Sequence, residues 1–172
     1  MKIPFVDICK TGNQYDITSD GWFPVSDMRR CRPVLSTVVL CRKGEGQVEV
    51  SGFLQTGVSV DCDRCLTQFD IIVDSRFHLV LEVAGKQSQQ IKELEISACE
   101  EFDIVELKDP VVDLEDILRQ QLYLSLPDKF LCSRECKGLC VTCGAELNTT
   151  NCHCKIEEKS SPFSVLTSLK KR

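Results

Sequence analysis

The chain has 172 residues, of which 26 are acidic and 21 are basic, so its formal net charge is −5. This length favours one domain with a small appended module, and it allows a hydrophobic core that does not depend on a metal. No apolar stretch is long enough to cross a bilayer, and residues 1–30 show neither a signal-peptide nor a transit-peptide pattern. The twelve cysteines are therefore expected to be reduced, in a cytoplasm or, if a presequence has been removed, in an organelle matrix.

The first half of the chain has the pattern of an antiparallel sheet made of hairpins. β-Branched residues and alternating apolar positions dominate between Val34 and Val83, separated by short glycine-containing turns such as Thr56-Gly57. Residues 12–32 carry few periodic cues and are expected to form a loop. The expected strands are residues 2–8 at an edge, Val34–Cys41, Gln47–Gln55, Val58–Cys62, Phe69–Val73 and Arg76–Val83.

An acidic segment follows and leads into one helix. Residues 93–116, called the acidic belt below, contain ten acidic residues and one lysine, a local balance of −9. At most two short strands are expected in the belt, at Leu94–Ser97 and Asp103–Leu107. Asp113 is placed to cap a helix that ends before Pro127, with one apolar face that packs on the sheet. That face consists of Leu114, Ile117, Leu118 and Leu122.

Six cysteines are concentrated in residues 132–154 and predict a metal site. The Cys140–Gly144 segment places two residues between its thiolates and a glycine after them, so both sulfurs can turn toward one ion. The predicted ligands of one Zn(II) ion are Cys140, Cys143, Cys152 and Cys154, with Cys132 and Cys136 able to replace one pair. An iron–sulfur centre is the alternative metal group, and disulfides or packed thiols are the alternatives without metal.

A further Cys-x-x-Cys pair, Cys62 and Cys65, lies between two expected strands. Three interpretations compete: a redox dithiol, a pair of metal ligands, or a reduced structural pair. A thioredoxin-type pair stands at the start of a helix, whereas the flanks here are β-rich. Metal ligation, jointly with one pair of the later cysteines, is therefore the preferred active role. The remaining cysteines have no ligand spacing and are expected to be packed or free thiols; they are Cys9, Cys31, Cys41 and Cys99.

The sequence shows no catalytic constellation, and an enzyme is not expected. His78 lies in an expected strand without an associated nucleophile, and His153 is at most a reserve metal ligand among the cysteines. No phosphate-cradling glycine loop or dinucleotide fingerprint is present. The carboxylates of the acidic belt define no acid–base pair.

The predicted fold class is α+β, with an antiparallel β-sheet meander, one main helix and a small C-terminal cysteine-rich zinc-binding module. Three parts are expected: a β-rich core domain over 1–130 with a helix at 113–125, a metal module over 131–156, and a basic tail helix over 157–172. The acidic belt suits a basic protein partner, or it is a solvated surface that keeps the protein in solution. The basic tail offers a small contact for phosphates.

Several motifs in this order resemble those of one family, YceD, the large ribosomal RNA subunit accumulation proteins. The motifs are Cys62-Asp-Arg-Cys65-Leu66, the helix over 113–124 leading into Leu126-Pro127, the run over 136–144 with Leu147-Asn148 and Cys152-His-Cys154, and the ending over 162–170. The resemblance extends from about Val58 to the C-terminus, and residues 1–45 add little to it.

The resemblance implies a non-enzymatic factor for large ribosomal subunit biogenesis that supports accumulation of the large-subunit (23S) rRNA. The implied partners are a large-subunit precursor, a basic large-subunit ribosomal protein or the rRNA itself, with no membrane and no small-molecule substrate. The implied compartment is the bacterial cytoplasm, with the plastid stroma as the alternative, and the metal is implied to be a local fold staple. The alternative function is a zinc-ribbon-like adaptor protein in transcription or another nucleic-acid process.

Overall fold

The computed structural model describes residues 1–26, 28–84 and 103–154, and the chain divides into two compact units. The first unit consists of Met1–Asp61 and Gln68–Phe130, and the second consists of Cys62–Thr67 and Leu131–Arg172. The sequence placed residues 62–67 in the core domain over 1–130. The structure instead places Cys62–Thr67 in the second unit, together with the later cysteines. Within the described ranges, no helix has the length and apolar character needed to cross a membrane.

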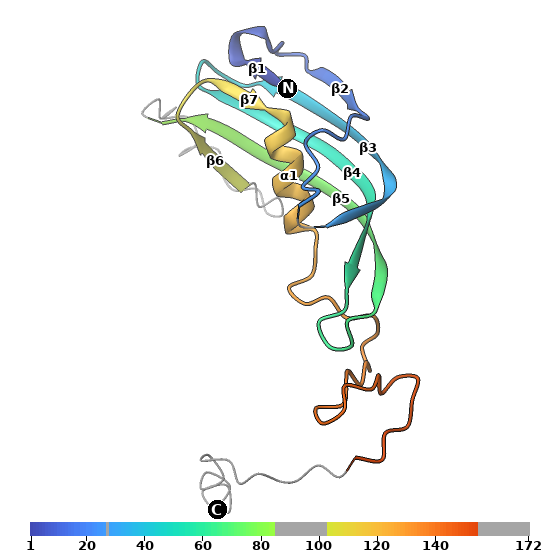
Figure 1. Cartoon of the computed structure of the whole chain (residues 1–172). Helices are drawn as coiled ribbons and strands as arrows, with labels where there is room; N and C mark the ends of the chain where they lie inside the picture. The colour runs from blue at the N-terminus through green and yellow to red at the C-terminus, as the bar shows by residue number, and fades with distance from the viewer. Residues whose placement is uncertain (27, 85–102, 155–172) are drawn as a thin grey trace, which may run out of the picture. The chain divides into compact units, whose positions relative to one another are not determined.

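A five-stranded sheet with the order β2–β3–β4–β5–β6 forms most of the first unit (Figure 1). Its strands are β2 (Asn13–Ile17), β3 (Arg29–Arg42), β4 (Gln47–Asp61), β5 (Gln68–Val83) and β6 (Asp103–Leu107). A smaller antiparallel pair joins β1 (Lys2–Pro4) to β7 (Val111–Asp113), and a 3₁₀ turn, η1 (Phe5–Asp7), follows β1. One α-helix is described, α1 (Leu114–Leu124), and it confirms the main helix expected from the sequence.

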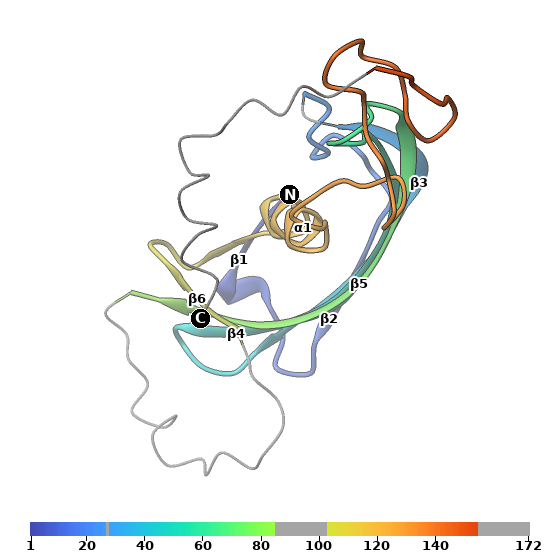
Figure 2. The same ribbon diagram turned by 90° about the horizontal axis from the view of Figure 1, so that it is seen from below.

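The core of the first unit lies between the sheet and α1. Figure 2 shows the sheet curving around the helix, which contacts β4 and β5. The expected apolar face of α1 is buried: Leu114, Leu118 and Leu122 are 0% exposed. The segment between β2 and β3 adds the buried ring of Trp22, whose backbone carbonyl accepts a hydrogen bond from Arg119 Nε at 3.1 Å. Burial of these side chains is the main term that stabilises the unit.

The predicted turn at Thr56-Gly57 is wrong, because both residues lie inside the continuous strand β4. Gly57 pairs with Ile72 of β5 and with Arg32 of β3, where the register of β3 is irregular. A Cβ at Gly57 would stand 2.8 Å from Cys31 Sγ, so the glycine permits a close approach of β3. Glycine inside a strand often has this role, so the Thr56-Gly57 pair by itself does not indicate a turn.

The antiparallel meander predicted between Val34 and Val83 is confirmed by β3, β4 and β5, whereas β6 adds a parallel neighbour to β5 that the sequence did not predict. A parallel neighbour needs a connection of a dozen or more residues, and the segment after Val83 is long enough to provide it. β6 itself was expected as a strand and is confirmed. The expected loop over 12–32 contains β2 and the start of β3, whereas the expected strand at Leu94–Ser97 and the tail helix over 157–172 lie outside the described residues.

Asp113 stands at the N-cap position of α1, but its side chain makes no capping hydrogen bond. The strand pairing of β1 with β7 satisfies one amide of the first turn, because the amide of Leu114 donates to the carbonyl of Met1 at 3.1 Å. The first turn of α1 nonetheless contains Glu115 and Asp116, whose charges are favourable near a helix N-terminus.

The spacing between the strands at Gly52 gives a stability prediction. A Cβ at this position would lie 2.5 Å from the carbonyl oxygen of Thr37 and 3.0 Å from the Phe77 ring, whereas a Cβ at Gly44 would meet nothing within 4 Å. We expect Gly52→Ala to lower the free energy of unfolding by about 1–3 kcal/mol, and Gly44→Ala to change it by less than about 0.5 kcal/mol. Urea unfolding of both variants measures this, and equal midpoint shifts would contradict the described strand spacing.

Candidate metal centre

Eight cysteines of the second unit form two groups, and within each group all four sulfurs lie within 4.8 Å of one another. The first cysteine group consists of Cys62, Cys65, Cys132 and Cys136, and the second cysteine group consists of Cys140, Cys143, Cys152 and Cys154. No cysteine is shared between the groups.

The first cysteine group joins two segments that are far apart in the sequence. Cys62 and Cys65 lie on a tight turn, closed by hydrogen bonds from the amide of Cys62 to the carbonyl of Thr67 and from the amide of Leu66 to the carbonyl of Cys62. Cys62 Sγ lies 3.8 Å from Cys136 Sγ, although 74 positions separate these residues. Cys65 Sγ lies 3.6 Å from Cys132 Sγ across 67 positions.

Backbone and side-chain hydrogen bonds hold these two segments together. Arg64 Nη1 donates to the carbonyl of Cys136 at 2.9 Å, and the amide of Leu139 donates to the carbonyl of Arg64 at 3.2 Å. Asn148 spans the turn between the two groups: its Oδ1 accepts from the amide of Lys137 at 2.8 Å, and its Nδ2 donates to Cys136 Sγ at 3.4 Å. Cys136 is therefore held at its carbonyl by Arg64 and at its sulfur by Asn148.

The second cysteine group is built on the turn predicted from the Cys-x-x-Cys-Gly spacing. The amide of Gly144 donates to the carbonyl of Cys140 at 2.8 Å, and the φ of Gly144 is +73°, a value that glycine adopts without strain. The amide of Thr142 donates to Cys140 Sγ at 3.4 Å. Cys152 Sγ lies 3.4 Å from the sulfurs of both Cys140 and Cys143, so the later pair closes over the turn.

Each group contains a thiol whose pKa is lowered to about 6 and a thiol whose pKa is raised to about 12. Burial acts to raise the pKa of Cys62, but three backbone N–H donors outweigh it and lower that pKa to about 6. Backbone N–H donors of the turn lower the pKa of Cys140 to about 6 as well. Hydrogen bonds to neighbouring sulfurs raise the pKa of Cys132 and of Cys154 to about 12. Four thiolates so close together repel one another, and a cation that binds all four must displace the remaining protons.

The distances between sulfurs suit one ion per group. A tetrahedral zinc site with Zn–S bonds of about 2.3 Å has sulfurs about 3.8 Å apart, close to the separations in both groups. The sulfur of Cys152 lies 3.4 Å from those of Cys140 and Cys143, which is far longer than a disulfide bond of about 2.05 Å. Each group could therefore hold a metal ion as a closed, four-thiolate site.

Sequence reasoning grouped the cysteines differently in one respect. The four ligands of first choice do lie together, as the second group. Cys132 and Cys136 do not replace one of its pairs; they lie with Cys62 and Cys65 in a separate group. The Cys-x-x-Cys spacing of Cys62 and Cys65 indicates a possible ligand pair. The structure places this pair beside a later pair, Cys132 and Cys136, as the sequence led us to expect.

The other candidate residues lie outside both groups. His153 is not among the clustered ligands, and His78 Nε2 lies 2.7 Å from Glu49 Oε1 in the first unit. Cys9, Cys31 and Cys41 are free thiols outside the groups, and Cys99 lies outside the described residues.

Part of the acidic belt is described, from residue 103 onward. Asp103, Glu106 and Asp109 are exposed and make no ion pair with another described residue. Asp116 differs from them because its Oδ1 lies 3.6 Å from Arg119 Nη1. The described belt therefore presents several carboxylates that form no ion pair with a described residue, together with one exposed lysine, Lys108.

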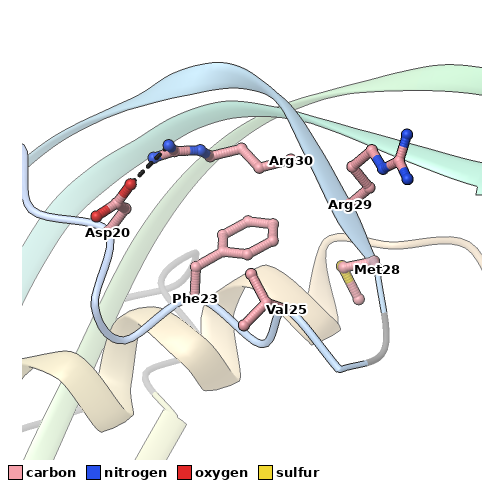
Figure 3. A pocket seen from close by; sticks show the side chains of 6 residues that line it. All are labelled: Asp20, Phe23, Val25, Met28, Arg29 and Arg30. Carbon is pink, nitrogen blue, oxygen red and sulfur yellow. Dashed lines mark ion pairs between the residues drawn. The ribbon is translucent and has the colours of Figure 1, made fainter.

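The first unit also contains a pocket of about 340 Å³ beside the start of β3 (Figure 3). Arg30 Nη2 is engaged by Asp20 Oδ2 at 2.6 Å, so the guanidinium is already paired. The other lining side chains are apolar apart from Arg29 and include no nucleophile or acid–base pair. The pocket is lined by Asp20, Phe23, Val25, Met28, Arg29 and Arg30.

The fold and the cysteine groups define a β-rich protein with a cysteine-rich module that could hold metal. The chain belongs to the YceD family: the model of that family, described as large ribosomal RNA subunit accumulation protein YceD, matches residues 50–170. The matched range includes all eight grouped cysteines and α1.

Two curated plant proteins are similar to this chain, and both are named large ribosomal RNA subunit accumulation protein YCED homolog 1, chloroplastic. The protein from Arabidopsis thaliana is 26% identical over 167 residues, which cover 86% of this chain and 52% of the relative. The protein from Zea mays is 28% identical over 144 residues, which cover 72% of this chain and 49% of the relative. The chain thus spans about half the length of these relatives. No solved structure matches.

Alanine substitution of Gly138 and Gly144 tests the hydrogen bond from the amide of Leu139 to the carbonyl of Arg64. Both glycines have a φ of +73°. A Cβ at Gly138 would lie 3.0 Å from the carbonyl oxygen of Arg64, whereas a Cβ at Gly144 would meet nothing within 4 Å. Alanine strains the backbone about equally at both sites, by about 1–2 kcal/mol. Only Gly138→Ala should weaken the hydrogen bond from Leu139 to Arg64, which faster amide hydrogen exchange at Leu139 would report. Equal exchange in the two variants would count against the described contact.

Proposed function

We propose that this chain is a non-enzymatic factor for large ribosomal subunit biogenesis and that it supports accumulation of the large-subunit (23S) rRNA. The match of the YceD family over residues 50–170 carries this proposal. The names of the two similar plant proteins refer to the same large-subunit rRNA and support it further.

The chemistry of the described residues supports binding rather than catalysis. Catalytic zinc sites keep a coordination position open, whereas a four-cysteine group closes the site to substrate. His78 is held by Glu49, which also lies 2.6 Å from Lys43, so its imidazole belongs to a surface charge network. We therefore assign the protein no catalytic residues.

Zinc in the second cysteine group is the proposed staple of the cysteine module. The ligand set is the first choice from the sequence: Cys140, Cys143, Cys152 and Cys154. The described residues of the second unit form only turns and one isolated β-bridge, between Leu139 and Glu146. An ion in the second cysteine group would therefore add a cross-link that this regular structure does not provide. Small modules of this kind obtain much of their folding free energy from the metal.

A basic large-subunit ribosomal protein is the proposed direct partner, either free or within an assembly intermediate. The supporting observation is the exposed, unneutralised acidic surface that begins at β6 and continues to Asp109. Such a surface repels the phosphates of RNA and attracts a strongly basic protein. Both compartments named from the sequence, the bacterial cytoplasm and the plastid stroma, contain ribosomes of the bacterial type, so the proposal holds for either.

Sedimentation of cell extract tests the proposed function. We expect the native protein to migrate with precursors of the large subunit, and we expect its depletion to lower large-subunit rRNA while small-subunit rRNA is retained. An adaptor of the transcription machinery would instead migrate with RNA polymerase and lower both rRNAs together. Unchanged rRNA levels after depletion, with the protein in light fractions only, would refute the proposal.

Charge reversal tests the proposed partner surface. Asp103→Lys, Glu106→Lys and Asp109→Lys, combined in one variant, should weaken capture of the basic ribosomal protein by at least tenfold. Added salt should weaken capture by the parent protein in the same direction, because it screens exposed charges.

The matched control reverses three other exposed acidic residues, Asp7, Glu45 and Asp74, and produces the same change in net charge. This control should retain most of the binding. If both variants lose binding equally, net charge alone is responsible, and the described belt is a solvated surface.

A further inference from the structure

We propose that the first cysteine group is a second structural Zn(II) site, so that the chain holds two zinc ions and not one. This inference concerns the metal content of the second unit and does not rest on the proposed function. The ligands are Cys62, Cys65, Cys132 and Cys136.

The geometry of the first group is that of a complete ligand set. Two of its sulfur pairs are 3.8 Å apart, for Cys62 and Cys136, and 3.6 Å apart, for Cys65 and Cys132. These values bracket the edge of about 3.7–3.8 Å expected when Zn–S bonds of about 2.3 Å point to the corners of a tetrahedron. Thiolates that each bind a different iron of an iron–sulfur cluster stand farther apart, so one shared ion is the better fit.

The surroundings of the group are adapted to sulfur that carries negative charge. The amide of Cys132 donates to Cys62 Sγ at 3.4 Å, and Asn148 Nδ2 donates to Cys136 Sγ at 3.4 Å. Hydrogen bonds from N–H groups to ligand sulfur are the usual outer support of a zinc–thiolate site. The guanidinium of Arg64 donates to the carbonyl of Cys136 at 2.9 Å. A metal cation would therefore supply the positive charge that these thiolates need.

The two groups are separate sets, and no cysteine belongs to both. Each group has its own complete set of four sulfurs within 4.8 Å. The chain from Cys136 to Cys140 connects them and contains Gly138, whose φ of +73° turns the backbone between the sites. The sites also differ in what they join. The second group closes a local loop, whereas the first links the turn at Cys62 to a segment about seventy residues later.

Native mass spectrometry of the full chain, prepared with zinc under reducing conditions, tests the proposal. We expect two zinc ions per chain in the parent protein and one in the Cys62→Ser/Cys65→Ser variant. The matched Cys140→Ser/Cys143→Ser variant should also retain one ion, and Cys9→Ser, which removes an exposed cysteine outside both groups, should retain two. A parent protein with a single zinc ion, or with iron in place of zinc, would overturn the proposal.

Thiol alkylation of the parent protein decides the case even if a variant fails to fold. Cys132 and Cys9 are both exposed, so exposure alone predicts that both react with N-ethylmaleimide. We expect Cys132 to react at least tenfold more slowly in the zinc-loaded protein than after a chelator removes the metal, and we expect the rate of Cys9 to stay the same. An unchanged rate for Cys132 after removal of the metal would show that Cys132 is not a ligand.

Discussion

The antiparallel pairing of β4 with β5 is the constraint on which the rest of the structure depends. Its register continues without interruption from Gln47 opposite Glu82 to Asp61 opposite Gln68. In the first unit, this long pairing provides the surface against which α1 buries its leucines. At its end the pairing leaves only Cys62–Thr67 to connect the two strands. A connection this short must turn tightly, and the tight turn brings the sulfurs of its two cysteines to one side.

In the second unit, hydrogen bonding and thiolate repulsion act in opposite directions. Backbone amides draw the sulfurs together and lower the pKa of Cys62 and Cys140, which favours the charged form that repels its neighbours. A divalent cation would resolve this conflict, because it would bind the charged form of all four sulfurs. A cross-link that closes a loop of about seventy residues also stabilises the folded chain by about 4 kcal/mol in the chain-entropy estimate. The first cysteine group closes a loop of that length.

The acidic strand β6 connects the fold to the proposed function. β6 ends the strand order of the described sheet, and an edge strand with unpaired backbone groups is prone to pair with other chains. Exposed carboxylates at Asp103 and Glu106 oppose such pairing and leave the surface open to a partner of opposite charge. The same residues therefore disfavour edge pairing in the isolated protein and form the surface on which the proposed basic partner would bind.

The sequence by itself determined the features that depend on neighbouring residues. The apolar face of α1, the strand at Asp103–Leu107 and the Cys-x-x-Cys-Gly turn all follow from spacings of a few positions. Only the tertiary structure decided which cysteine pairs combine, that β6 lies parallel to β5, and that Gly57 serves a close approach of β3. The physical reason is that these features join segments that are distant along the chain. Spacing specifies how two sulfurs on one turn are oriented, but the partner of Cys62 depends on where the chain places Cys136 after 74 further positions.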